Sequence, residues 1–219
     1  MFAGHYGVSF AAKSVDKRIP LWQLFLAVQF LDVIWGPLVL LGIEKVRIVP
    51  GITASLPLDL YYMPYTHSLV GALALSGLVA LGYRIASGGD ASHTLRSALL
   101  VGLAVFSHWF LDLLVHRPDL PLYDNTHKMG LGLWDYPVLA FGLETTFLFG
   151  GMWLYSRSTA GTSFGGRFGM PLFGLALLVV QAIAFFGPPP RSPAAAAITF
   201  LTLYALMAGV AFWLEKKRT

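Results

Sequence analysis

The feature that most restricts the fold of this chain is a series of apolar stretches, each long enough to cross a lipid bilayer. Several windows of about 20 residues contain no charged side chain, which is the pattern of a transmembrane helix. Only 12% of the 219 residues are charged, whereas a soluble domain carries roughly twice that fraction. Since exposed irregular backbone is not tolerated in lipid, the spans must be helices. The sequence therefore predicts an all-α, polytopic membrane helix bundle.

The apolar stretches divide the chain into about six spans preceded by a short helix, which we expect at 2–13. The residues between 46 and 64 should form an irregular connection, and 117–134 a loop long enough to serve as a lid or binding loop. We treat 1–219 as a single membrane domain, with metal-site helices in 1–155 and scaffold helices in 156–219. The expected spans are 21–43, 65–85, 94–115, 136–155, 170–186 and 195–214.

One of these spans carries an unusual polar stripe. His108, Asp112 and His116 recur every fourth residue, so that on a helix they lie along a single face. The residues between them are all apolar. Ionisable side chains in a bilayer cost a few kcal/mol each on insertion scales and usually mark a functional site. This stripe is therefore the starting point for any hypothesis about function.

The other polar residues that hydropathy does not explain are His5, Asp32, His67 and Glu144. The chain contains no cysteine, so a metal site would have to use imidazole and carboxylate ligands, a set that suits zinc and similar divalent ions. Taken one at a time these residues also have simpler interpretations. His67 is explained as an interfacial residue, Asp32 as a packing or proton-relay group, and Glu144 as a buried hydrogen-bond partner.

The order of these motifs resembles the family of predicted membrane-bound metal-dependent hydrolases. The resemblance rests on Gly4-His5, on Asp32 in a span, on Thr66-His67-Ser68, and on His108 followed four residues later by Asp112. It implies a metal site formed by His5, Asp32, His67, His108 and Asp112. The family in turn is similar to the zinc-dependent phospholipase C and single-strand nuclease group, which are helical enzymes that hydrolyse phosphoesters.

This chain departs from the family pattern at three points. Met63-Pro64-Tyr65 stands where many members have His-Arg, and Asp32 stands alone where the family often has a doubled Asp. The soluble enzymes also have a His four residues before a later Glu, whereas Ala140 precedes Glu144 here. These departures favour one or two bound ions, with zinc as the first choice, over a cluster of three.

Three functions remain open on this reading. In the first, the protein is a membrane-embedded hydrolase of a phosphoester or lipid-type substrate, in which His116 or Glu144 moves the proton and Arg117 holds an anionic phosphate. In the second, the same residues form an ion or proton pathway of a transporter, although no inverted repeat is evident. In the third, a non-catalytic scaffold carries a structural metal.

The basic residues predict both partners and orientation. The formal net charge is +4, but Lys and Arg lie in short connections between spans, so we expect lipid contacts and no nucleic acid. Because cytoplasmic loops are enriched in Lys and Arg, the side with more of them should face the cytoplasm. This puts the site in the non-cytoplasmic half of a cell or inner membrane. One side holds Lys13, Lys17, Arg18, Arg84, Arg96, Arg157, Arg167, Lys216, Lys217 and Arg218, and the other Lys45, Arg47, Arg117, Lys128 and Arg191.

Overall fold

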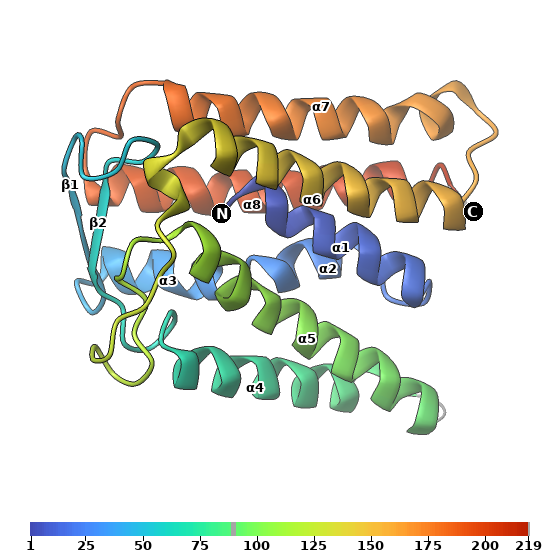
Figure 1. Ribbon diagram of the computed structural model, residues 1–219. Coiled ribbons are helices and arrows are strands. Elements are labelled where there is room, and N and C mark those ends of the chain that lie inside the picture. The colour runs from blue at the N-terminus through green and yellow to red at the C-terminus, as the bar shows by residue number, and fades with distance from the viewer. Residues whose placement is uncertain (89–90, 219) are drawn as a thin grey trace.

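The computed structural model describes residues 1–88 and 91–218 as a helix bundle with a small β-hairpin at one end (Figure 1). The helices run roughly along one direction, and the hairpin covers the end at which α7 leads into α8. The elements are α1 (Ala3–Val15), α2 (Leu21–Val28), α3 (Phe30–Leu40), β1 (Lys45–Ile48), β2 (Leu58–Tyr62), α4 (Leu69–Ser87), α5 (Ala91–Val115), the 3₁₀ turn η1 (Leu133–Asp135), α6 (Pro137–Ser158), α7 (Phe164–Phe186) and α8 (Pro193–Glu215).

The helices α4 to α8 are each long and apolar enough to cross a membrane, and α2 with α3 makes a sixth candidate span. The predicted all-α membrane bundle is thus confirmed. The first span is not one straight helix as expected, because it bends by 54° at Gln29 between α2 and α3. At the bend the Val28 carbonyl accepts a hydrogen bond from His108 Nδ1 on α5, at 2.7 Å. The break therefore turns a backbone group of one span toward a polar side chain of another.

The short first helix lies inside the bundle. Tyr6 and Phe10 of α1 are fully buried, and the helix passes between α5 and α6 in Figure 1. Its contact with α6 is backbone to backbone, because a Cβ built at Gly151 would lie 1.9 Å from the Gly7 carbonyl oxygen. Two glycines thus let α1 approach α6 closely enough to bring its N-terminal residues to the middle of the bundle.

Residues 46–64, expected to be irregular, instead contain the antiparallel pair β1 and β2. The long loop at 117–134 is present as predicted and is ordered by two isolated bridges, Leu120 with Met129 and Tyr123 with Thr126. Helix α7 starts at Phe164, earlier than the expected Met170, because Ser163 caps it by accepting a hydrogen bond from the Gly166 amide. The start was missed because the first turn is rich in glycine and carries Arg167, so it does not look like membrane sequence.

At the opposite end of the bundle, the carboxylates of Asp16 and Glu215 connect several helices. Asp16 accepts hydrogen bonds from the side chains of Arg18, at 2.8 and 2.9 Å, and of Ser97, at 2.6 Å. The hydrogen bonds from Arg18 hold the pKa of Asp16 well below its ordinary value, more than offsetting the effect of burial. Glu215 of α8 pairs with Lys13 of α1 and accepts a hydrogen bond from the Leu21 amide. These contacts join α1, α2, α5 and α8 at the basic end.

Candidate metal centre

The structure brings together all five residues that the sequence predicts as metal ligands. Asp32 lies in the first turn of α3, His67 directly before α4, His108 and Asp112 one turn apart on α5, and His5 on α1. His5 and His108 are fully buried, Asp112 and His67 nearly so, and Asp32 is the most accessible of the set. Five side chains from four different helix regions therefore converge in the interior.

Two of the imidazoles each lie close to two of the carboxylates. His67 Nε2 lies 3.3 Å from Asp32 Oδ1 and 3.9 Å from Asp112 Oδ2. His108 Nε2 lies 3.8 Å from Asp32 Oδ1 and 3.2 Å from Asp112 Oδ2. Ligand atoms around a tetrahedral zinc ion are about 3.3 to 3.6 Å apart, given zinc–ligand bonds of about 2.0 to 2.2 Å. The ligand atoms of Asp32, His67 and His108 lie within 4.8 Å of one another, as do those of His5, His108 and Asp112, so each of these two groups could hold a divalent ion.

Hydrogen bonds to the far side of each ring set the tautomer that a ligand requires. His108 Nδ1 contacts the Val28 carbonyl, which can only accept, so the ring proton sits on Nδ1. His67 Nδ1 lies 2.7 Å from Thr66 Oγ1, whose own proton is donated to Glu44 Oε2 at 2.6 Å. The Thr66 hydroxyl therefore accepts from His67. In both rings Nε2 is the atom that faces the carboxylates, as in metal-bound histidines oriented by an outer hydrogen bond.

His108 Nε2 also gives a direct sign of fit to a cation. This atom is buried and makes no hydrogen bond within the described part of the chain. A divalent ion bound between this atom and the two carboxylates would satisfy it. The residues present therefore fit the metal that the sequence predicts.

His5 lies on the other side of Asp112. Its ring stacks on that of His108, with centroids 4.0 Å apart and planes 3° from parallel, and its Nε2 lies 3.2 Å from Asp112 Oδ1. The amino group of Met1 pairs with the same oxygen. Asp112 Oδ1 thus faces His5 and Met1, whereas Oδ2 faces His67 and His108. A second ion beside His5 would have to share Asp112 as a bridge.

His116, a predicted proton carrier, lies at the rim of this group. Its Nε2 is 3.4 Å from Asp112 Oδ2, and its Nδ1 is 2.8 Å from Asp119 Oδ1. Burial alone would lower the pKa of His116, but the carboxylates of Asp112 and Asp119 raise it to about 9. The ring also packs against Trp134, with centroids 4.2 Å apart. His116 therefore holds its proton between two carboxylates.

Glu144 reaches the centre from α6 but is engaged by α1. Its Oε2 accepts hydrogen bonds from the Phe2 and Gly4 amides, at 2.8 and 3.2 Å, and its Oε1 accepts one from the Gln181 side chain at 3.0 Å. These contacts cap the start of α1 with a carboxylate. Glu144 also lines the pocket beside the metal ligands, so its predicted part in proton transfer stays a prediction.

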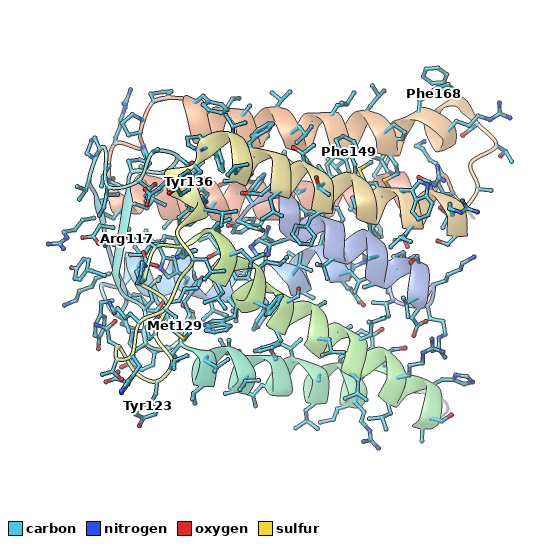
Figure 2. The ribbon with its side chains drawn as sticks, in the orientation of Figure 1. Arg117, Tyr123, Met129, Tyr136, Phe149 and Phe168 are labelled. Carbon is cyan, nitrogen blue, oxygen red and sulfur yellow. The ribbon has the colours of Figure 1, made fainter. Side chains whose placement is uncertain are left out.

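Arg117 lies farther from the ligands, among the hairpin and the long loop (Figure 2). Its guanidinium pairs with Asp59 of β2, and its Nε is 3.4 Å from Asp119 Oδ2. It does not line the pocket at the metal ligands. The arrangement links the hairpin to the loop and, through Asp119, to His116. The predicted role of Arg117 in holding a phosphate stays a prediction.

Several residues of the centre were missed by sequence reasoning. Glu44 and Thr66 were not predicted to act in the site, yet together they orient His67. Asp119 looked like an ordinary loop residue, and Tyr204, whose hydroxyl donates to Asp32 Oδ2 at 2.5 Å, lies in a span with no ionisable residue. The one available signal was the position of Thr66 directly beside His67.

A pocket of about 700 Å³, counted with its open mouth, adjoins the ligands. Asp32, His67, Asp112 and His116 form its polar side, and residues from the hairpin, α7 and α8 form its apolar side. A reacting group at the polar side would therefore be held in largely apolar surroundings.

Comparisons with protein-family models, curated proteins and solved structures find no match to this chain. The geometry of the centre must therefore carry the functional argument.

Proposed function

We propose that the protein is a membrane-embedded, divalent-metal-dependent hydrolase acting on a phosphoester or lipid-type substrate. The observation that carries the proposal is that His67 Nε2 and His108 Nε2 each lie 3.2 to 3.9 Å from a carboxylate oxygen of Asp32 and one of Asp112. When bound there, a divalent ion, with zinc as the first choice, supplies Lewis-acid activation of water and of a substrate oxygen. The adjoining pocket supports catalysis over a purely structural role.

Residues of the chain orient the ligands, move the proton and exclude water from the site. The Val28 carbonyl and the Thr66 hydroxyl orient the two imidazoles, and the Tyr204 hydroxyl holds Asp32. His116 is the group best placed to move a proton, since its Nε2 faces the ligands while Asp119 fixes its Nδ1. Trp134 and other apolar residues of the pocket exclude bulk water from that exchange.

The first experiment is elemental analysis of the protein purified in mild detergent, beside D112A and the control variant D135A. Asp135 is an exposed carboxylate at the same end of the molecule, so its removal should leave the metal content unchanged. Zinc or another divalent ion, present in the unmodified protein and in D135A but lost in D112A, would support the proposal. Absence of metal from all three proteins, even after metal is added back, would refute it.

A second measurement separates hydrolysis from transport. The metal-loaded protein should release inorganic phosphate from a phosphatidic acid or a phenol from an aryl phosphodiester, and H116A should slow that release while retaining the metal. If instead the reconstituted protein moves zinc or protons across a vesicle membrane, and D32N abolishes the flux without any hydrolysis being detectable, the polar residues form a transport pathway.

For localisation we propose a cell or inner membrane, with the hairpin end of the bundle on the non-cytoplasmic side. The support is that ten of the 15 Lys and Arg residues lie at the opposite end. The chain has no cysteine, so single cysteines report orientation cleanly. In intact cells a membrane-impermeant maleimide should label Y123C and leave R157C unlabelled; the reverse pattern would overturn the orientation.

A further inference from the structure

The pocket at the metal ligands adjoins a second, apolar groove. The groove lies between α7, α8 and the segment that joins β1 to β2. None of its lining residues is charged. The two hollows have a common boundary, so a molecule that displaces the side chains at this boundary would occupy both. The residues that line both are Leu56, Leu58, Val180, Ala184, Phe200 and Leu203.

The groove faces lipid. Both α7 and α8 are candidate membrane spans, and Ile183, one of its lining residues, is 62% exposed on the outer surface of α7. In Figure 1 these two helices form one side of the bundle, and the turn between them lies next to the hairpin. Three consecutive prolines in this turn, Pro188 to Pro190, line the outer end of the groove. Its mouth thus lies where the spans α7 and α8 meet the membrane interface.

One side of the same hollow is formed by the segment between the strands. The segment between the strands folds over it, held by a hydrogen bond from the Val49 amide to the Pro57 carbonyl at 2.7 Å. Ser55 Oγ fastens this segment to the loop by donating to the Trp134 carbonyl, also at 2.7 Å. A charged, water-soluble molecule would have to cross this cover, whereas an amphiphile in the bilayer meets an apolar opening between two spans.

We propose that the substrate is a membrane lipid, whose aliphatic chain occupies the groove between α7 and α8 while its phosphate-bearing head group reaches the metal ligands. The placement of the head group rests on the proposed function; the placement of the chain rests on the groove alone. The chain passes from one apolar environment to another and never enters water. The head group meets the polar wall formed by Asp32, His67 and His116.

Photolabelling tests the position of the chain without requiring turnover. The protein is reconstituted in nanodiscs containing phosphatidylglycerol with a diazirine at the end of one acyl chain, irradiated, digested and mapped by mass spectrometry. Labels should concentrate on Val180, Ala184 and Leu203 relative to Leu172 and Leu175, which are exposed on α7 and report ordinary lipid contact. Equal labelling of both sets would overturn the proposal.

Tryptophan substitutions test whether the labelled lipid occupies the groove. A184W places an indole at the common wall of the two hollows and should reduce labelling of the groove several-fold. A176W, on an exposed position of the same helix, should leave it unchanged. L203W fills the groove from α8 and serves if A184W does not fold. Groove labelling that survives both groove variants, or that falls equally in A176W, would contradict the inference.

The outcomes separate this inference from the proposed function. Zinc content is measured on the same samples, and A184W should retain the zinc that D112A loses. A protein that binds zinc but shows no preferential labelling of the groove leaves the hydrolase proposal standing and refutes lipid as its substrate. A protein that labels in the groove but binds no metal keeps the chain site and refutes the hydrolase.

Discussion

The hydroxyl of Thr66 offers the most selective test of the metal centre, because it touches no proposed reacting atom. It accepts a hydrogen bond from His67 Nδ1 and donates one to Glu44 Oε2, at 2.7 and 2.6 Å. T66V keeps the shape of the side chain and removes both contacts. His67 then loses the acceptor that fixes its ring orientation and tautomer, while Glu44 keeps hydrogen bonds from the Tyr65 and Thr66 amides.

The expected loss can be stated in advance. Removing an outer-shell partner of a metal-bound histidine typically weakens metal binding by about 10- to 100-fold, which corresponds to about 1.4 to 2.7 kcal/mol. The buried Nδ1–H of His67, left without an acceptor, also costs on the order of 1–3 kcal/mol of folding stability. Competition for zinc with a fluorescent chelator, in detergent at pH 7, measures the first effect, and thermal unfolding measures the second.

Two variants complete the design. T66S restores a hydroxyl at the same place and should recover most of the zinc affinity. T202V removes a hydroxyl that binds only the Ile198 carbonyl on an exposed face of α8, and should leave affinity and stability unchanged. If T66V is folded and binds zinc as tightly as T66S does, then His67 is not a ligand oriented by Thr66, and the argument from its tautomer fails.

Other consequences follow from the same contacts. Zinc at 100 times its dissociation constant should stabilise the unmodified protein by about 2.7 kcal/mol and leave the melting temperature of D112A unchanged; equal shifts in both would show binding elsewhere. G151A should destabilise the protein by about 1–3 kcal/mol, because the added Cβ would meet the Gly7 carbonyl oxygen at 1.9 Å. Its control is G150A, whose Cβ meets nothing within 4 Å, and similar melting temperatures for the two would contradict the close packing of α1. Because the folded state lowers the pKa of Asp16, its carboxylate adds stability that is fully present above the unfolded value of about 3.9. That stability is lost as the pH falls toward the lowered value, so the difference in melting temperature between the unmodified protein and D16N should be constant near neutrality and shrink below about pH 4.

The fold class was predictable because membrane insertion leaves a strong and simple signal. Long apolar stretches locate the spans α4, α5, α6 and α8 to within a few residues. The start of α7 was missed because hydropathy does not register a polar first turn capped by Ser163. The bend at Gln29 was missed for a related reason, since the stretch around it is mostly apolar and contains no proline at the break.

The candidate ligands were predictable for an energetic reason. An ionisable residue in an apolar span is expensive, so Asp32, His108 and Asp112 stood out before any geometry was known. Spacing alone placed His108 and Asp112 on one face of a helix. No local pattern could place His5 and Asp32 beside them, because those contacts cross between helices whose relative positions depend on the packing of the whole bundle.

The groups that orient the histidines could not be predicted, because no sequence pattern marks a backbone carbonyl or a short polar side chain for this role. The Val28 carbonyl binds His108 only because the chain bends at Gln29, and Glu44 binds Thr66 only because the segment from β2 returns to the end of α3. Each irregularity in the spans thus lies beside a proposed ligand. A straight first span would carry Val28 within an ordinary helical hydrogen bond and leave the Nδ1 proton of His108 without its acceptor. Restoring a straight helix would therefore weaken the metal centre even if every ligand residue were kept. The break in the first span is thus part of the site, because it provides the acceptor that orients His108.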